Sequence, residues 1–429
     1  MRVTLFRRFL AASGLSNFSD GIALVAWGWI ASALTRDPLL IALVPVALKT
    51  PWFVFSLPAG ILVDRHDRRG IILAADILRG VAYAAAGIAV WWTLPFGDPP
   101  LRGTDHPGIF ALVALCAVSV GLAEVLRDNA AQTMLPALVP EDALERANGR
   151  LWSVEYVMNN FIGTAAAGVL LGVSLALPFG MNAAALALSV ALVMRLKGDF
   201  RADVEATVER RPWHEELREG FAFLMSNEIL RNLALLTGLF NFAFEAMLIT
   251  LVLIVQERLQ LGPLALSAIM AAGGAGGVLA GMANERLLGL LGRARSMQVW
   301  LAVSLVFPAA VLVAGGGTSG LAVIAAAFFV TEFGSVIWNT VSVSYRQRTI
   351  PRRLLGRVNS AYRLFAIGMA PLGMLTGGLL IRGSGHFMPR ETALLAPYLM
   401  ALTLLAAGCI GYWRFLARAF AVEPPKSPR

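Results

Sequence analysis

Long runs of apolar residues alternate with short polar segments along the whole chain. Each run is close to the roughly 20 residues that an α-helix needs to cross the hydrocarbon core of a bilayer. Transmembrane β-strands would instead give segments of about 10 residues in which apolar and polar positions alternate. The pattern therefore predicts an integral membrane protein built from helices.

Twelve membrane-spanning helices are expected, in two groups of six. The predicted spans are 9–34, 39–63, 71–94, 108–127, 151–175, 179–196, 229–256, 264–284, 297–315, 320–341, 359–382 and 393–415. The predicted organisation is an N-terminal bundle over 1–196, a cytoplasmic linker over 197–228 and a C-terminal bundle over 229–429. The linker has the longest charged stretch of the chain, and its segment WHEELREGFAFL is interpreted as a short amphipathic helix on the membrane face.

Composition and charge support this picture and give an orientation. Hydrophobic residues make up 57% of the chain and charged residues 15%, with a mean hydropathy of +0.69, whereas average domains carry about 25% charged residues. Most of the 36 Lys and Arg residues fall on the side of the membrane that holds both termini. The loops on the opposite side hold Arg36, Arg102, Arg258, Arg382 and Arg390. By the positive-inside rule, both termini are expected in the cytoplasm of a bacterial cell with the protein in the inner membrane.

The sequence contains few candidate residues for catalysis, metal binding or nucleic-acid binding. The net charge of +9 is explained by topology and by anionic lipids, so no nucleic-acid partner is predicted. Cys116 and Cys409 both lie in predicted spans and the four His residues are scattered, so we expect no disulfide, no metal site and no cofactor. An intramembrane enzyme or a receptor would need a nucleophile–base pair or an added soluble domain, and neither is found. We therefore expect a protein that is not an enzyme.

The two halves of the chain carry related polar segments. RDNAAQTMLPALVPEDALERANGRLWS follows the fourth predicted span, and NTVSVSYRQRTIPRRLLGRVNSAYR follows the tenth. At an offset of 211 residues these segments align Pro140 with Pro351, Arg146 with Arg357 and Asn148 with Asn359. Further on, Gly163 and Gly168 align with Gly373 and Gly378 at an offset of 210. Two parallel six-helix repeats are the construction of a large class of secondary transporters.

A dense charge cluster, GILVDRHDRRG, separates the second and third predicted spans. It resembles the signature loop of the major facilitator superfamily, Gly-x-x-x-Asp-Arg-x-x-Arg-Arg, with Gly60, Asp64, Arg65, Arg68 and Arg69 at the fixed positions. Three further fragments, NFSDGIALVAWGW, ADILRG and LGRVNSAYR, are similar to the enterobactin-exporter and macrolide-efflux branch of that family. Two positions depart from the family pattern: Asp67 stands where many members have Gly, and Thr164 stands where the fifth helix usually has Pro.

The resemblance implies a fold, a gate and an activity. The fold is all-α and membrane-embedded, with twelve transmembrane helices in two pseudo-symmetric six-helix bundles. In the family, the Gly of the loop packs against helix 11, the Asp faces the N-terminus of that helix, and the Arg residues bind an acid at the end of helix 4. That acid would be Asp128 here. Together these contacts hold the two halves in one conformation.

The implied activity is export, by alternating access, of a small amphipathic or cationic compound such as a drug, a macrolide or a siderophore-like molecule. Protons are the expected coupling ion, lipids are the surrounding partners, and a monomer is expected. A facilitator that moves lysophospholipid with the same fold is the alternative, and the missing helix-5 Pro is consistent with it.

Four charged residues lie near the centres of predicted spans, where a charge is costly and functional by default: Asp20, Lys49, Glu245 and Glu332. The three acids fall on helices 1, 7 and 10, which line the central cavity in the family fold. We expect Asp20 and Lys49 to pair as a gate or tether. We expect Glu245 and Glu332 to carry protons or to anchor a cationic group. Asp76 and Arg79, at i and i+3, are interpreted as an intrahelical pair that reaches toward the membrane surface.

Overall fold

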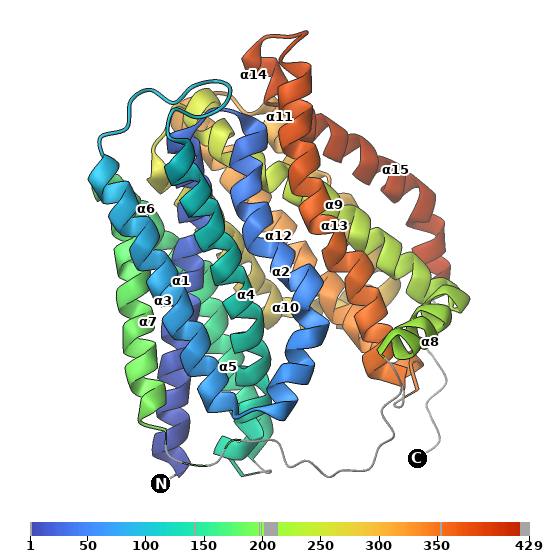
Figure 1. Ribbon diagram of the computed structural model, residues 1–429. Helices are drawn as coiled ribbons and strands as arrows, with labels where there is room; N and C mark the ends of the chain where they lie inside the picture. Colours follow the sequence, from blue (N-terminus) through green and yellow to red (C-terminus); the bar gives the residue numbers. More distant parts are fainter. Residues whose placement is uncertain are drawn as a thin grey trace. The chain divides into compact units, whose positions relative to one another are not determined.

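A computed structural model describes residues 2–140, 143–196, 198, 200, 213–351 and 354–420. All the regular secondary structure of these residues is helical (Figure 1). Eleven helical stretches in this part of the chain are long and apolar enough to cross a membrane. The all-α membrane fold expected from the sequence is thus confirmed.

The first of two compact units comprises Met1–Val208 and Leu251–Ala271. Its helices are α1 (Arg2–Leu34), α2 (Pro38–Arg65), α3 (Arg68–Thr93), α4 (Pro107–Leu138), α5 (Leu144–Val157), the π-helical η2 (Met158–Gly163), α6 (Thr164–Val173), α7 (Leu177–Met194) and the π-helical η3 (Ile254–Arg258). The segment Leu251–Ala271 belongs to this unit because Gln256 of η3 donates a hydrogen bond to Ser32 of α1 at 2.9 Å.

The second unit comprises Glu209–Thr250 and Ala272–Arg429. Its helices are α8 (Trp213–Ser226), α9 (Glu228–Leu253), most of α10 (Pro263–Val303), α11 (Val306–Val313), α12 (Gly317–Thr349), α13 (Leu355–Ser384), α14 (Arg390–Ala393) and α15 (Ala396–Ala419).

The helix α10 contains a sharp break at Gly292, whose backbone torsions are φ 72° and ψ 167°. Residues with a side chain essentially never adopt this conformation, whereas glycine does so readily. The break separates the predicted span 264–284 from the next, 297–315. Because one continuous stretch, Pro263–Val313, includes both spans, the eleven stretches hold all twelve predicted spans.

The residues at which helices begin and end follow the same internal repeat as the sequence. α4 ends at Leu138 and α12 ends at Thr349, while α5 begins at Leu144 and α13 begins at Leu355. Both pairs of ends are 211 residues apart, which is the offset of the aligned polar segments. One expectation is corrected: the segments that begin at Arg127 and Asn339 are not loops at first, because α4 and α12 continue through them.

Close helix contacts are also repeated in the two halves. A Cβ atom on Gly163, at the end of η2, would lie 2.6 Å from the carbonyl oxygen of Phe18 in α1. A Cβ atom on Gly373 of α13 would likewise collide with the carbonyl oxygen of Phe242 in α9. In each half, therefore, the fifth span rests on the first span at an aligned glycine, where no larger residue fits.

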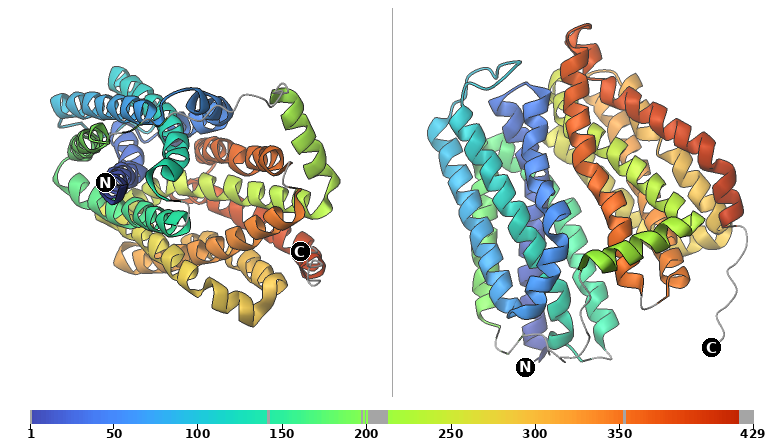
Figure 2. Two further views of the ribbon diagram at one scale, coloured as in Figure 1. Left: turned by 90° about the horizontal axis from the view of Figure 1, so that it is seen from below. Right: turned by 45° about the vertical axis from the view of Figure 1, so that its right-hand side comes forward.

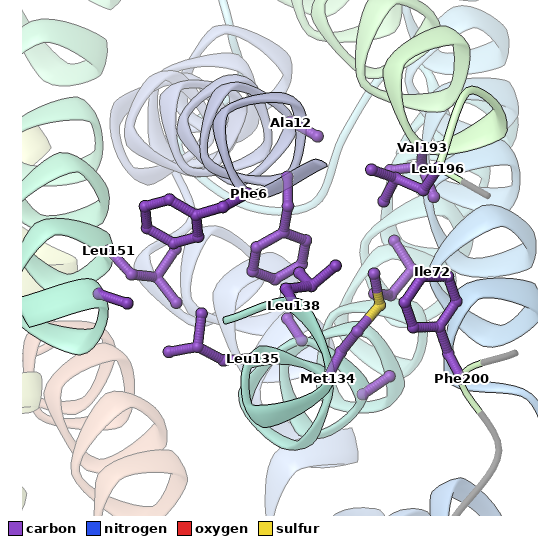
Figure 3. Close-up of a cluster of buried hydrophobic side chains, with 14 of the residues drawn as sticks. Phe6, Ala12, Ile72, Met134, Leu135, Leu138, Leu151, Val193, Leu196 and Phe200 are labelled. Atoms are coloured by element: carbon purple, nitrogen blue, oxygen red, sulfur yellow. The ribbon is translucent and has the colours of Figure 1, made fainter. Parts of the chain in front are cut away.

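An apolar core fills the end of the first unit that holds the N-terminus (Figure 3). Its side chains come from α1, α2, α3, α4, α5 and α7, and include Phe9, Met134 and Leu138, each at most 1% exposed. Ile72 of this core lies one helical turn before Asp76, and Ala130 lies one turn after Arg127. The core therefore fixes the rotation of α3 and α4 directly beside their charged residues.

The helix predicted within the linker is present as α8 and runs across the beginning of α13 (Figure 2). The rings of Phe221 and Phe365 stack with their centroids 5.8 Å apart. Glu219 and Arg357 form an ion pair. A Cβ atom on Gly220 would collide with the backbone carbonyl of Arg357, so only glycine allows the two helices to approach this closely.

Candidate functional site

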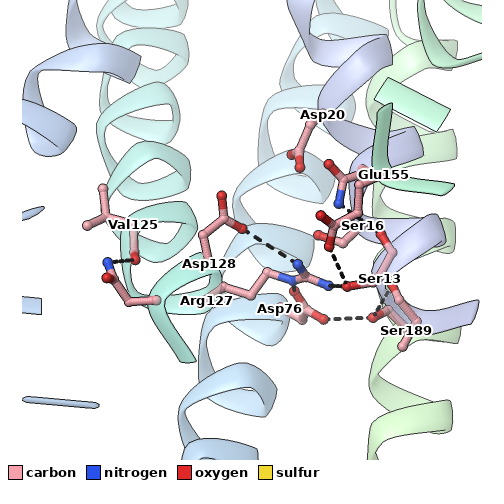
Figure 4. A network of polar contacts seen from close by, with 12 residues as sticks. Ser13, Ser16, Asp20, Asp76, Val125, Arg127, Asp128, Glu155 and Ser189 are labelled. Atoms are coloured by element: carbon pink, nitrogen blue, oxygen red, sulfur yellow. Dashed lines mark hydrogen bonds and ion pairs between the residues drawn. The ribbon is translucent and has the colours of Figure 1, made fainter. Parts of the chain in front are cut away.

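Two buried arginines in the first unit, Arg79 and Arg127, join three aspartates into one charge network. Figure 4 shows Arg127 with Asp76 and Asp128. Arg79 of α3 forms an ion pair with Asp20 of α1 and lies 3.6 Å from Asp76, one turn earlier in its own helix. Nε of Arg127 in α4 lies 3.3 Å from the same Asp76 oxygen, Oδ1, that Arg79 approaches, and Nη1 of Arg127 lies 3.6 Å from Oδ1 of Asp128. Charges of alternating sign thus run from Asp20 through Arg79, Asp76 and Arg127 to Asp128.

Serine hydroxyls extend this network to further helices of the first unit. Ser16 accepts a hydrogen bond from Arg79 at 2.7 Å, and Ser189 of α7 donates one to Asp76 at 2.7 Å. Ser13 donates to Glu155 of α5 at 3.1 Å. Because Arg127 also donates to Ser13 at 3.4 Å, the network ties α1, α3, α4, α5 and α7 together through polar contacts.

The network is deeply buried. The side chains of Asp76 and Arg79 are 0% exposed and that of Arg127 is 2% exposed. Burying a charge is costly unless opposite charges and hydrogen bonds compensate it. The intrahelical pairing of Asp76 with Arg79 is confirmed, but the expectation that it reaches the membrane surface is wrong, because both side chains point into the bundle.

Asp20 has a different partner from the one expected. The sequence prediction paired it with Lys49 of α2, whereas the structure places the guanidinium of Arg79 on its carboxylate. Lys49 lies in the middle of α2 and its side chain is half-buried. Sequence spacing gives the depth of a residue in a helix but not the direction of its side chain, and α3 turns Arg79 toward α1.

The signature loop forms the junction between α2 and α3. Gly60, Asp64 and Arg65 lie in the last turns of α2, and their side chains are outside the described part of the structure. Asp67 caps the N-terminus of α3 by accepting a hydrogen bond from the backbone N–H of Gly70 at 3.2 Å. This explains why an acidic residue suits a position where many family members have glycine.

The arginines Arg68 and Arg69 fasten this junction to the chain around the end of α7. Arg69 donates to the carbonyl oxygens of Val193 at 3.2 Å and Met194 at 2.7 Å, at the C-terminus of α7, where the helix dipole favours a positive charge. Arg68 approaches the same region, its backbone N–H donating to the carbonyl of Phe200 at 3.4 Å. The expected link from the loop to Asp128 is therefore corrected for Arg69.

In the second unit, the two deep acids predicted from the sequence lie near each other. Glu245 of α9 and Glu332 of α12 interact electrostatically. A Cβ atom on Gly273 of α10 would lie 3.0 Å from Cγ of Glu332 and would collide with the ring of Phe328. The absence of a side chain at Gly273 thus makes room for both the acid and the ring that precedes it by one turn.

A wall of stacked aromatic rings runs beside this acid pair. Phe328 stacks on Phe244 at a centroid distance of 5.8 Å, Phe244 on Phe240 at 5.3 Å, and Phe240 packs against Trp300 at 4.9 Å. Trp338 stacks on Trp300 at 4.2 Å. Ring faces attract cations and apolar surfaces alike. The acids and the wall together could hold a molecule that has a positive group and an apolar body.

No group of three or more His, Cys, Asp or Glu side chains in the described ranges is arranged to hold a metal ion. The two cysteines are both free thiols. The carboxyl groups at these sites can bind cations and exchange protons. The sequence had identified the three deep acids, but it missed Arg79 and Arg127 as members of the network: Arg79 was assigned to an intrahelical pair with Asp76, and Arg127 was placed at the end of a predicted span.

Comparison with known proteins bears on the whole chain. The family model for the Major Facilitator Superfamily matches residues 9–374. Macrolide efflux protein A of Streptococcus pyogenes is 23% identical over 381 residues, which cover 87% of this chain and 88% of that protein. Multidrug efflux pump Tap of Mycobacterium tuberculosis is 24% identical over 409 residues, covering 89% and 87% respectively.

Solved structures show the same fold. A single-residue mutant of the nucleoside transporter NupG superimposes with a TM-score of 0.77 at 11% identity and covers 96% of this chain and 99% of its own. A bacterial homologue of the iron transporter ferroportin, in its inward-facing state, gives a TM-score of 0.68 at 17% identity, covering 95% and 98%. The resemblance that the signature loop indicated is thus found across nearly the full length.

Proposed function

The chain belongs to the Major Facilitator Superfamily, and from this premise we propose that it exports small amphipathic or cationic compounds by proton-coupled alternating access. Its relatives named for macrolide and multidrug efflux support this kind of activity. The proposed location is the bacterial inner membrane, with both termini in the cytoplasm and the protein acting as a monomer.

The observation that supports the proposal most directly is the acid pair Glu245 and Glu332 beside the aromatic wall of Phe244 and Phe328. A substrate ammonium group would be neutralised by the carboxylates while its apolar body packs on the rings. Protons bind to the same carboxyl groups. A proton and a cationic substrate therefore compete for one site, and this competition would couple export to the proton gradient.

We assign the charge network of the first unit a different role. Asp20, Arg79, Asp76 and Arg127 compensate one another, so they are suited to holding helices in a defined arrangement rather than to binding cargo. The signature loop, with Gly60 and Asp64, is proposed to act as the conformational latch that the family resemblance implies. Asp128 would take part through Arg127.

Transport into vesicles with an imposed pH gradient tests the proposal. The purified protein is reconstituted and offered a macrolide, a cationic dye, a siderophore and a fluorescent lysophospholipid. We expect the dye or the macrolide to be moved, and we expect Glu332→Gln and Glu245→Gln to abolish the part of transport that depends on the gradient. Glu285→Gln is the matched control, because Glu285 is an exposed acid on α10.

Two outcomes would contradict the proposal. Gradient-driven transport by Glu332→Gln at the rate of the Glu285→Gln control would show that the acid pair is not the coupling site. Movement of the lysophospholipid alone, without dependence on the gradient, would favour the lipid-moving facilitator instead.

A further inference from the structure

Four fully buried side chains in the first unit carry polar atoms that have no direct hydrogen-bond partner among the described residues. They are Ser19 and Trp27 of α1, Tyr83 of α3 and Asn182 of α7, each at most 1% exposed. The unpartnered atoms are Ser19 Oγ, Trp27 Nε1, Tyr83 Oη and both Oδ1 and Nδ2 of Asn182. Buried polar atoms in folded proteins almost always have partners, so five in one bundle require an explanation.

Helix packing places Tyr83 at the level of Asn182. A Cβ atom on Gly87 would lie 3.1 Å from Cβ of Phe179, and one on Gly80 would lie 3.7 Å from Cβ of Leu186. α3 and α7 therefore run antiparallel in contact. Tyr83 lies midway between the two glycines on α3, and Asn182 lies midway between the two partner residues on α7. The two side chains are therefore at the same level of the interface.

α1 brings its two residues to the same level. Ser189 of α7 hydrogen-bonds the carbonyl of Ala12 at 3.2 Å, and the ring of Phe179 packs on Trp27 at a centroid distance of 5.1 Å. Ser19 lies between these two contacts on α1, as Asn182 does on α7. The rings of Trp27 and Tyr83 also stack, 5.7 Å apart. The indole N–H and the phenol hydroxyl of this pair interact, but they do not reach the geometry of a direct hydrogen bond.

The same interface touches the charge network. Tyr83 follows Arg79 by one helical turn on α3, so the two side chains share a face. Arg79 engages Asp20, Asp76 and Ser16 through its terminal nitrogens, but its Nε is a further buried atom without a partner in the described part of the chain. The unpartnered atoms thus extend from the guanidinium of Arg79 to the amide of Asn182.

We propose that the interface of α1, α3 and α7 binds a cluster of water molecules that connects Asn182, Ser19, Tyr83 and Trp27 to Arg79. A water molecule needs two to four polar partners in a buried site, and donors and acceptors are both present: an indole and a guanidinium N–H donate, hydroxyls do either, and an amide does both. The cluster hydrates one side of the Asp20–Arg79 ion pair from within the bundle. It would allow these charges to move apart without becoming desolvated.

X-ray footprinting of the full chain in lipid nanodiscs tests this, because hydroxyl radicals formed from water oxidise the side chains next to it. Tyr398 is the matched control: it is also 0% exposed, but its hydroxyl donates a 3.0 Å hydrogen bond to the carbonyl of Met247. We expect Tyr83 to be oxidised about tenfold faster than Tyr398, since the proposed water molecules lie next to its side chain. Equal oxidation of the two tyrosines would overturn the proposal.

Two variants strengthen the test. Asn182→Leu removes the central amide, and we expect oxidation of Tyr83 to fall to the level of Tyr398. Asn182→Ser keeps a hydrogen-bonding group in a smaller side chain, and it should retain the oxidation of Tyr83. If Asn182→Leu does not fold, Ser19→Ala replaces it; unchanged oxidation of Tyr83 in whichever folded apolar variant is measured would contradict the water site.

Discussion

The charge network depends most on Arg79, because this one guanidinium contacts Asp20, Asp76 and Ser16. Its aliphatic chain and its guanidinium group are both fully buried. Removing one partner of a buried ion pair leaves the other charges uncompensated, which costs far more than the pair contributes. Arg79 is therefore the position in the first unit where a single substitution should be most damaging.

We expect Arg79→Met to lower the free energy of unfolding by about 3–5 kcal/mol, the usual cost of breaking a buried pair. Thermal unfolding in detergent measures the change. Adding Asp20→Asn should restore part of the loss, since it removes one of the stranded carboxylates. Arg286→Met, at an exposed arginine of α10, is the control. Equal stability of Arg79→Met and this control would show that the network does not stabilise the fold.

Residue types and depths could be predicted from the sequence, but partners could not. Glu245 and Glu332 were identified because a carboxyl group inside an apolar run is conspicuous, and the structure brings them near each other. The predicted partner of Asp20 was Lys49 of α2, whereas the ion pair in the structure is with Arg79 of α3. An apolar helix has no polar face to show which way its few charges point.

Helix ends show a related limit at the scale of elements. The span predicted over 39–63 agrees closely with α2, Pro38–Arg65. The agreement is close because both ends of this helix coincide with changes from apolar to polar residues. The fourth predicted span ends at residue 127, but the helix α4 continues to Leu138. The adjacent charges Arg127 and Asp128 suggest a membrane boundary, yet Arg127 is compensated inside the bundle by Asp76.

The linker helix α8 was predicted from its amphipathic pattern, but its packing against α13 could not be predicted. The ion pair of Glu219 with Arg357 contributes little, because the two side chains are 33% and 26% exposed and such pairs are worth about 0–1 kcal/mol. The close approach at Gly220 and the stacking of Phe221 on Phe365 should matter more, since both depend on direct packing.

Gly220→Val is therefore expected to release α8 from α13, whereas Glu219→Gln should not. Hydrogen–deuterium exchange of peptides from α8 measures the effect. We expect about tenfold faster exchange in Gly220→Val, which corresponds to about 1.4 kcal/mol of lost protection. Exchange that is faster in Glu219→Gln than in Gly220→Val would show that the ion pair, not the packing, holds the helix.

At the scale of the whole molecule, the repeat was the strongest signal in the sequence. Matching Pro, Arg and Asn in two polar segments predicted two related bundles, and the helix ends recur at the same offset. The division into units could not be predicted in full: Leu251–Ala271 makes its contacts with the first unit, although it lies in the second half of the chain. Such contacts form between distant segments and leave no local pattern.

Twelve spans place both chain ends on one side of the membrane, which the distribution of Lys and Arg predicts to be the cytoplasm. Green fluorescent protein fused after Arg429 should therefore fluoresce in bacterial cells, and alkaline phosphatase fused there should be inactive. The same reporters inserted at Asp98, between α3 and α4, should give the opposite result. Active phosphatase at the C-terminus would reverse the orientation.

The torsion angles of Gly292 have a consequence well beyond their own neighbourhood. A straight helix of 41 residues, the length of α10, would measure about 60 Å, twice the thickness of a hydrocarbon core of about 30 Å. The turn at Gly292 converts this rod into an out-and-back pair. The two predicted spans on either side of Gly292 can therefore cross the bilayer in succession, and the left-handed backbone that only glycine adopts readily is what allows the chain to bend between them.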